Sequence, residues 1–422
     1  MNNLKYHKFL LILVAVLSSC VDSTSKTVSE KLGVSKERIE KINEKWTDYV
    51  STNQLAGAVV YVYRKGEVVF HQAFGQSDVE KQTPMTTESI FRIASQSKAI
   101  VSLGVMMLQE DGKLFTGDPV GKYIEEFNET TVAEPIEGGG YRVVPAKRKI
   151  TIQDLLTHTS GLGYGYGLAS KEWENASIQG WYFAHRNEPI LSTVKRMALL
   201  PLDAQPGSAY VYGYSTDVLG ALIEVVSGQT LDEFLEERIF KPLNMSNTQF
   251  YLPLERQGQL ATVYAYDSSG IKRAPNEGTM ESQGHYVEGP KMSFSGGAGL
   301  LSTAQDYGNF LQLFLNKGVF NNNRLVSRKT IELMTSVYVQ DELFPWTKGT
   351  GFGLGFSISE DVGKRAQLGS VGEFGWGGAY HSTYWVDPAE ELVVVYLTQL
   401  IPAGDIDDHQ TLRNLIYQAI VD

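Results

Sequence analysis

The chain has 422 residues and a mass of 46.8 kDa, about two to three times the usual length of one domain. Its 42% hydrophobic and 20% charged residues are ordinary for a globular protein and exclude a disordered chain. The net charge of −11, from 37 Lys and Arg against 48 Asp and Glu, argues against nucleic acid as a partner. A single cysteine excludes an internal disulfide and a zinc site built from several thiolates.

The N-terminus has the pattern of an export signal. Two lysines precede the apolar run 9–17, which is too short to span a bilayer as a helix. The Leu-Ser-Ser-Cys that ends at Cys20 resembles the bacterial lipoprotein signal, in which the cysteine becomes the acylated first residue of the mature protein. We therefore predict a signal peptide at 1–19, lipidation at Cys20 and a location at the bacterial cell envelope. A secretory peptide whose Cys20 merely lies near the cleavage site is the alternative.

The next segments predict a tether, a helix and a hairpin. Residues 20–35 are rich in Ser, Thr, Lys and Glu and indicate a flexible tether. Behind a Ser35 N-cap, apolar residues recur at three- to four-residue spacing and predict an amphipathic helix. The runs 57–63 and 67–74 are β-branched and aromatic, and the Arg-Lys-Gly between them predicts a β-hairpin.

Helices are predicted in the middle of the chain and strands again near its end. Capping signals at Thr151, Thr230 and Thr303 each precede an apolar run. Strand patterns follow in the last quarter, and a final helix begins at about Asp407. The expected strands are 351–358, 380–386 and 391–399. We therefore predict an α+β (α/β) fold, in which an antiparallel sheet flanked by helices is assembled from about 36–95 and 290–422, with a helical subdomain at about 96–289.

A lysine stands out at the start of a charge-free helix. Residues 99–108 carry no charge on any face, so the helix should be buried all round. Helical side chains lean towards the N-terminus, so Lys98 reaches back over Ser95. Burial disfavours the charged form of an amine, and a neutral amine could accept the serine proton. The free amides at the helix start would help to hold the resulting oxyanion.

The spacing of this serine and lysine is weak evidence alone. Ser23 with Lys26 and Ser192 with Lys195 repeat the Ser-x-x-Lys pattern, and neither pair precedes a comparable buried helix. An N-cap serine with a surface lysine behind it is the alternative interpretation of Ser95.

Two further segments could complete a site. Residues 206–220 carry a Pro-Gly turn and three alternating tyrosines before a helix that Ser215 or Thr216 would cap. A tyrosine beside a lysine ammonium can act as a general base, whereas a plain half-buried strand is the alternative. Residues 372–380 place glycines before a strand, where a substrate could approach a backbone N–H, although a simple bulge also fits.

Two more segments belong with those around Ser95, 206–220 and 372–380: Leu-Leu-Thr-His-Thr-Ser-Gly at 155–161 and Gly-Gly-Ala-Gly-Leu-Leu-Ser-Thr at 296–303. All five resemble the serine β-lactamase and penicillin-binding superfamily, in its class C-like branch that includes carboxylesterases. The likeness runs from about Ser35 to the C-terminus. It implies a β-lactamase/transpeptidase-like fold with a cleft. It also implies Ser95 as the acyl-accepting nucleophile, Lys98 and Tyr212 as its proton partners, and the backbone N–H groups of Ser95 and Ala379 as the oxyanion hole.

Departures from the family pattern favour esters. The usual Tyr-x-Asn is Tyr-Gly-Tyr at 212–214, and Lys-Thr-Gly or His-Thr-Gly is Trp-Gly-Gly at 376–378. The missing amide, cation and hydroxyl weaken a grip on a β-lactam carboxylate, whereas an aromatic wall resembles the esterase members. The residues expected to contact the substrate are Trp376, Gly377, Gly378 and Tyr214.

The predicted function is a serine hydrolase, most simply a carboxylesterase of short-chain or uncharged esters, that forms an acyl-enzyme on Ser95 without a metal or cofactor. One alternative is a β-lactamase or D-amino-acid peptidase acting on cell-wall-like amides. Another is a catalytically weak, lipid-anchored binding protein on the same scaffold. The expected partners are a small ester or amide and the membrane, reached through Cys20. The Gly- and Tyr-rich segment 161–167 is predicted to form a mobile loop at the rim of the cleft.

Overall fold

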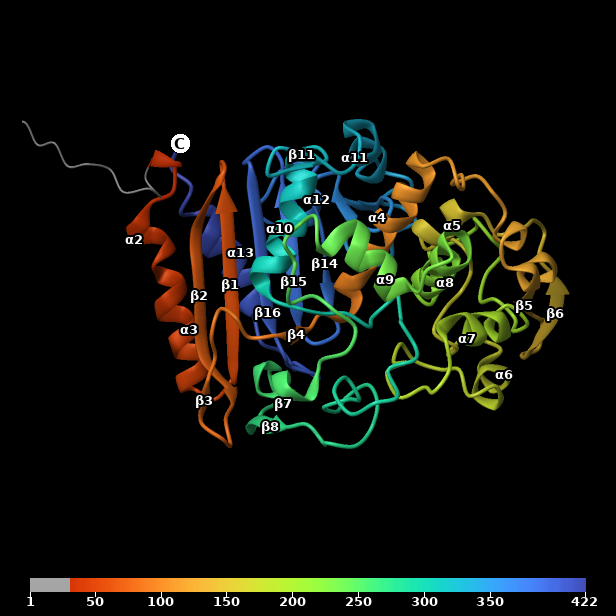
Figure 1. Cartoon of the computed structure of the whole chain (residues 1–422), viewed down its shortest axis with the longest axis horizontal. Coiled ribbons are helices and arrows are strands. Elements are labelled where there is room, and N and C mark those ends of the chain that lie inside the picture. The colour runs from red at the N-terminus through yellow and green to blue at the C-terminus, as the bar shows by residue number, and fades with distance from the viewer. Residues whose placement is uncertain (1–30) are drawn as a thin grey trace, which may run out of the picture.

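The structure is a computed structural model that describes residues 31–422, so the predicted signal peptide and Cys20 lie outside the described residues. An eight-stranded antiparallel sheet lies in the half of the protein that is on the left in Figure 1, with α2 (Lys36–Ile39) and α3 (Lys41–Ser51) outside it. In spatial order its strands are β12 (Thr350–Phe352), β13 (Ser357–Ser359), β14 (Phe374–Gly378), β15 (Ser382–Asp387), β16 (Leu392–Thr398), β1 (Gly57–Arg64), β2 (Glu67–Asp78) and β3 (Thr83–Pro84).

Both ends of the chain build this sheet, as the sequence predicts. The β1–β2 hairpin turns at Lys65 and Gly66, and β1 pairs with β16 in a register that sets Tyr61 opposite Val395. Every residue of β1 and β16 is buried, because helices cover both faces of these central strands.

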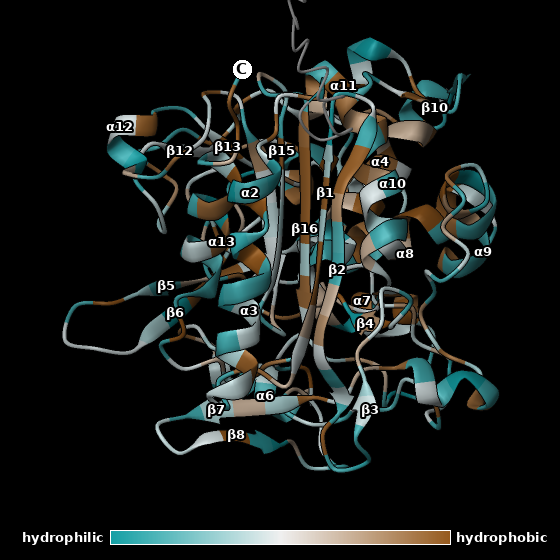
Figure 2. Cartoon of the chain, turned by 90° about the vertical axis from the view of Figure 1, so that its left-hand side faces the viewer, coloured by the Kyte–Doolittle hydropathy of each residue, from teal (hydrophilic) through white to brown (hydrophobic). Residues whose placement is uncertain are grey.

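Helices pack on the two faces of the sheet (Figure 2). One face carries α2 (Lys36–Ile39), α3 (Lys41–Ser51) and α13 (Asp408–Tyr417). Trp46 of α3 is fully buried there and meets Tyr396 of β16 edge to face, with ring centroids 5.6 Å apart. The other face carries α10 (Ala304–Leu315), which packs on β16 and β1.

The helical part lies beyond α10 and centres on two buried helices (Figure 1). These are α4 (Ser97–Glu110) and α8 (Ser215–Ser227), which pack on one another. All residues of α4 from 97 to 108 are buried, which confirms the helix predicted from its lack of charge. The surrounding elements are β5 (Thr131–Pro135), β6 (Tyr141–Pro145), α5 (Ile152–Leu156), α6 (Ser170–Asn175), α7 (Ile190–Met197) and α9 (Leu231–Leu235).

Short elements join these parts. They are β4 (Phe91–Arg92), η1 (Ala94–Gln96), η2 (Val120–Lys122), η3 (Glu125–Glu129), η4 (Glu236–Phe240), η5 (Leu254–Gln259), β7 (Tyr264–Asp267), β8 (Gly270–Arg273), β9 (Leu301–Ser302), β10 (Val319–Phe320), β11 (Asn323–Arg324), α11 (Arg328–Met334) and α12 (Val362–Arg365). No helix within residues 31–422 has the length and apolar character needed to cross a bilayer.

The structure differs from the predictions made from the sequence in three places. The strand expected at 351–358 is a hairpin, because Gly355 adopts φ 96° and turns the chain between β12 and β13. Order begins before Ser35, since Val34 is buried and pairs with Ile420. The β7–β8 hairpin belongs beside the sheet and not in the helical part, as the bridge between Tyr264 and Leu400 indicates.

Candidate active site

Ser95 lies in a tight turn between β4 and α4. It is the middle residue of η1, and the preceding Ala94 has φ 43°, in the left-handed region that a non-glycine residue rarely adopts. The N-cap of α4 is Gln96, which makes no side-chain cap bond. Ser95 is therefore not the capping residue of the alternative interpretation. Its hydroxyl instead lies 3.2 Å from the Lys98 amine.

Lys98 is 2% exposed and touches oxygens from three segments of the chain. Its Nζ lies 3.2 Å from Ser95 Oγ, 3.2 Å from the Tyr164 hydroxyl and 2.7 Å from the carbonyl oxygen of Gly297. A buried amine needs such partners, because an unpaired polar group away from water is costly. The result is a fixed amine beside the serine, in the first turn of a buried helix.

A buried carboxylate holds the peptide that contacts Lys98. Asp217 of α8 accepts hydrogen bonds from Ser295 Oγ at 2.6 Å and from the Gly297 N–H at 3.1 Å. Burial raises the pKa of Asp217 above its usual range, although these bonds and Lys98 act in the opposite direction. Asp217 thereby orients the Gly297 carbonyl that accepts from Lys98.

Tyr212 lies beside Lys98 through its ring. Lys98 Nζ is 4.7 Å from the centroid of the Tyr212 ring, a cation–π distance. The Tyr212 hydroxyl accepts a hydrogen bond of 3.1 Å from Trp376 Nε1. The structure thus brings together the predicted nucleophile and both of its predicted proton partners, while the phenol oxygen of Tyr212 is held by the tryptophan.

Tyr164 is the residue that the sequence interpretation did not assign to the chemistry. Its hydroxyl contacts Lys98, and its ring meets the Tyr212 ring edge to face at 5.8 Å. Burial, and then the nearby Tyr212, raises the pKa of Tyr164 well above its usual value, so the group is a neutral hydroxyl. The segment 161–167 was predicted to rim the cleft, and Tyr164 does line the cavity beside Ser95.

The Trp-Gly-Gly segment forms strand β14 itself, whereas the sequence placed it before a strand. Gly378 packs closely against the chain just before Ser95, since a Cβ on Gly378 would lie 2.5 Å from the Ile93 carbonyl oxygen. Side-chain-free residues are therefore needed where β14 meets η1. Ala379, the predicted oxyanion donor, follows and lines the same cavity as Ser95.

Ser95 opens onto a cavity of about 690 Å³. Its lining includes the aromatic residues Tyr164, Trp181, Tyr212, Trp346, Trp376, Tyr384 and Trp385. Two arginines, Arg365 and Arg413, also line the cavity, and both pair with Glu373, at 3.2 and 2.7 Å. The cavity therefore offers a substrate of Ser95 both aromatic rings and polar side chains.

Tyr214 does not contact this cavity, contrary to the expectation that it binds substrate. Its side chain is fully buried, donates to the Gly180 carbonyl oxygen at 2.8 Å and stacks on Trp173. The helix α8 begins at Ser215 with Tyr214 as its N-cap, so neither Ser215 nor Thr216 caps it. The tyrosines at 210–214 do not form the half-buried strand of the alternative interpretation either.

The ring of His158 packs against the ring of Tyr212. His158 is buried after α5 with φ 55°, and its ring lies 4.7 Å from that of Tyr212. Burial, and then the charge of Lys98, holds the pKa of His158 well below its usual range. A neutral imidazole packed against the tyrosine ring has a structural role at this site.

Comparison with known proteins identifies the family. The chain matches the family described as Beta-lactamase over residues 39–417, and it belongs to that family. Protein Rv1367c of Mycobacterium tuberculosis is 32% identical over 363 residues, covering 84% of this chain and 88% of the relative. Esterase EstB of Burkholderia gladioli is 29% identical over 365 residues, covering 83% and 88%. The solved structure of EstCE1, a hydrolase with promiscuous acyltransferase activity, superposes with a TM-score of 0.79 at 25% identity, covering 90% of this chain and 99% of that one.

The fold and the family thus define a serine hydrolase of the β-lactamase and penicillin-binding superfamily.

Proposed function

We propose that the protein is a carboxylesterase that cleaves uncharged or short-chain esters through an acyl-enzyme on Ser95. The observation that carries the proposal is the 3.2 Å contact between Ser95 Oγ and Lys98 Nζ at the floor of an aromatic cavity. Similarity to Esterase EstB supports ester substrates. The tryptophan at position 376 supports them too, because it adds apolar surface where a carboxylate-binding cation would suit a β-lactam.

The proposed acylation begins with the amine. A neutral Lys98 can donate its two hydrogens to Gly297 O and Tyr164 Oη, which leaves its lone pair for the Ser95 hydroxyl hydrogen. Ser95 Oγ then attacks the ester carbonyl, and the N–H groups of Ser95 and Ala379 stabilise the oxyanion. Tyr212 completes proton transfer to the leaving alcohol, and water later releases the acid by the reverse route.

Tyr212 is suited to this task by its neighbours. The Trp376 N–H donates to the phenol oxygen, and the Lys98 nitrogen lies over the ring. These two contacts hold the Tyr212 side chain beside the amine that has taken the serine proton. Tyr164 keeps its proton, so we assign it the role of positioning Lys98.

The experiment compares labelling and turnover. A fluorophosphonate probe followed by peptide mapping should place the adduct on Ser95, and Ser95→Ala should abolish both labelling and hydrolysis of p-nitrophenyl acetate and butyrate while the fold persists. Ser192→Ala is the matched control, because Ser192 starts another Ser-x-x-Lys whose Lys195 pairs with Glu126 at 2.9 Å. Labelling without ester turnover would favour the binding protein. Faster cleavage of a chromogenic cephalosporin than of the esters would favour the amide hydrolase.

We also propose, from the sequence, that the mature chain is lipid-anchored at the cell envelope through Cys20. The net charge of the whole chain is −11, so attraction to anionic lipids would not hold it there. Metabolic labelling with a palmitate analogue should mark the wild type and not Cys20→Ser. A Cys20→Ser chain that stays in the membrane fraction with the same label would contradict the proposal.

A further inference from the structure

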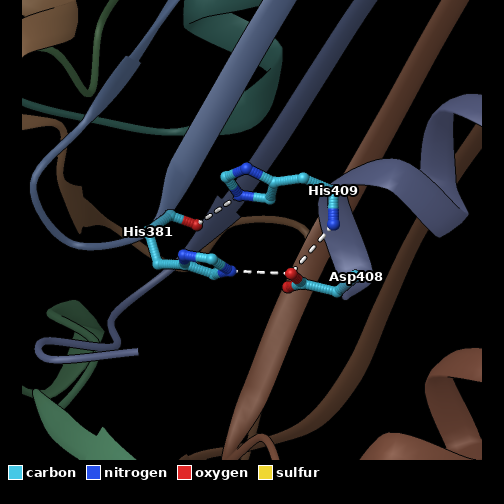
Figure 3. Close-up of side chains that lie close together, drawn as sticks. All are labelled: His381, Asp408 and His409. Atoms are coloured by element: carbon cyan, nitrogen blue, oxygen red, sulfur yellow. Dashed lines mark hydrogen bonds and ion pairs between the residues drawn. The ribbon is translucent and has the colours of Figure 1, made fainter. Parts of the chain in front are cut away.

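Three side chains gather at the turn between β14 and β15 (Figure 3). His381 lies in the turn, and Asp408 and His409 open helix α13. The His381 Nε2 is 2.6 Å from Asp408 Oδ1, and the His409 Nε2 donates to the backbone carbonyl oxygen of His381 at 3.1 Å. The two imidazole rings stack with centroids 4.0 Å apart and planes inclined by 17°.

Hydrogen bonds engage both oxygens of the Asp408 carboxylate. Its Oδ1 also accepts from the His409 N–H at 2.9 Å, and its Oδ2 accepts from the Tyr396 hydroxyl at 2.6 Å. Asp408 is fully buried, and although burial alone would raise its pKa, the bond and charge of His381 and the bond from Tyr396 hold the pKa below its usual range. The carboxylate is thus an ionised acceptor whose partners are fixed.

Two histidines and an aspartate are metal-ligand types, but their arrangement here is that of a hydrogen-bonded clamp. The lone pair of an imidazole nitrogen lies in the plane of its ring, so nearly parallel stacked rings do not aim at one ion between them. Because a carbonyl oxygen can only accept, His409 Nε2 carries a hydrogen and is not free to ligate. His381 Nε2 and Asp408 Oδ1 lie at hydrogen-bond distance from one another.

The clamp holds a strained turn. His381 has φ 59°, a left-handed conformation that is strained for a non-glycine residue and persists where the surroundings enforce it. Asp408 holds the side chain of His381, and His409 holds the backbone carbonyl of His381. The start of α13 therefore contacts His381 through two hydrogen bonds. Ala379 lies two residues earlier on the same turn, and Ser95, Ala379, His381 and His409 all line one cavity.

We propose that Asp408 and His409 act through His381 as positioning residues for the oxyanion hole. The clamp sets the turn that presents the Ala379 N–H to the substrate carbonyl, and this role rests on the proposed acyl-enzyme function. A donor displaced by about 1 Å from its productive place loses much of its transition-state stabilisation, on the order of a hundredfold in the limit. The clamp should therefore affect kcat and leave substrate binding nearly intact.

Matched variants separate the hydrogen bonds from the bulk of the side chains. Glutamine can place its amide nitrogen near the Nε2 position of histidine, so His381→Gln and His409→Gln retain a donor. His381→Leu and His409→Met keep similar volume and lose the donor. Each protein is titrated to completion with a fluorophosphonate, so that kcat is expressed per reactive Ser95, and the affinity for an alkyl boronic acid that adds to Ser95 is measured alongside.

We expect His381→Leu and His409→Met to lower kcat per titrated site about tenfold or more, with KM within about twofold. Boronate affinity should fall by the same factor, since its tetrahedral adduct needs the same oxyanion donors. The glutamine variants should retain most of the activity. Unchanged turnover per titrated site in the donor-less variants, or an equal loss in the glutamine and donor-less variants, would overturn the clamp while leaving Ser95 chemistry in place. Failure of the wild type to label at Ser95 would overturn the proposed function, and the clamp with it.

Discussion

The hydroxyl of Tyr164 lies 3.2 Å from the Lys98 amine, the same distance that separates this amine from Ser95. The contact joins the glycine-rich segment 161–167 to the start of α4. Deleting residues 161–167 would take a partner from Lys98, so it would slow acylation of Ser95 as well as change substrate range.

Tyr164→Phe tests this contact. We expect kcat/KM for p-nitrophenyl butyrate to fall about tenfold, because a hydrogen bond to the lysine is lost while the ring stays in place. Tyr212→Phe should lose about a hundredfold or more, as expected for an acid/base group. Tyr166→Phe is the control, since Tyr166 is 61% exposed in the same segment. A larger loss of kcat/KM in Tyr164→Phe than in Tyr212→Phe would mean that Tyr164 is the acid/base group and Tyr212 the positioning residue.

Gly297→Ala should disturb the amine from the opposite side. A Cβ at this position would lie 2.4 Å from Asp217 Oδ2, so the peptide whose carbonyl accepts from Lys98 must shift. We expect kcat/KM to fall at least about tenfold and urea denaturation to show a stability loss of about 1–3 kcal/mol. Gly258→Ala is the matched control, because a Cβ there meets no atom within 4 Å. Equal activity in both variants would show that the Gly297 carbonyl does not position Lys98.

Trp346→Ala should reveal the part of the substrate that the aromatic wall binds. Trp346 is 54% exposed at the cavity, with its ring centroid 5.3 Å from Trp376 and 5.1 Å from Tyr212. We expect KM for a naphthyl ester to rise about fivefold to tenfold through lost apolar contact, and KM for a small alkyl acetate to change little. Leu199→Ala, which alters an exposed apolar residue outside the cavity lining, should change neither. Equal changes for both esters would argue against an aromatic subsite.

Helix α4, with Ser95 and Lys98 at its start, could be predicted because its sequence signal is local. Ser95 and Lys98 are one turn apart, and the charge-free run that follows reports burial without any long-range information. The hairpin of β1 and β2 and the caps at Thr151 and Thr230 are likewise encoded by neighbouring residues, and the structure confirms them.

Contacts between distant segments could not be predicted in this way. Lys98 and Tyr164 are 66 residues apart, and His381 and Asp408 are 27 apart. The alternation of Tyr210, Tyr212 and Tyr214 was misleading as well, because faces alternate reliably only in a regular strand and this segment is irregular. Tyr214 consequently lies in the core, where the sequence placed it against substrate.

The neutral state of His409 should make the stability of the protein depend on pH. Burial, and then the charge of His381, lowers the pKa of His409 from 6.5 to about 4 in the folded chain. The unfolded chain therefore binds more protons between these values, so this contribution to stability is fully present above pH 6.5 and is lost as pH falls towards 4. At about 1.4 kcal/mol per unit, the free energy of unfolding should fall by about 2 kcal/mol from this group between pH 7.5 and 5.0. Urea denaturation at the two pH values should show a smaller difference for His409→Gln than for the wild type by that amount.

Working above pH 5 also avoids Glu188, whose pKa is lowered to about 2 chiefly by its bond to Arg196 and which loses its contribution only below 4.5. An equally steep decline in His409→Gln would mean that His409 takes up its proton in the folded state.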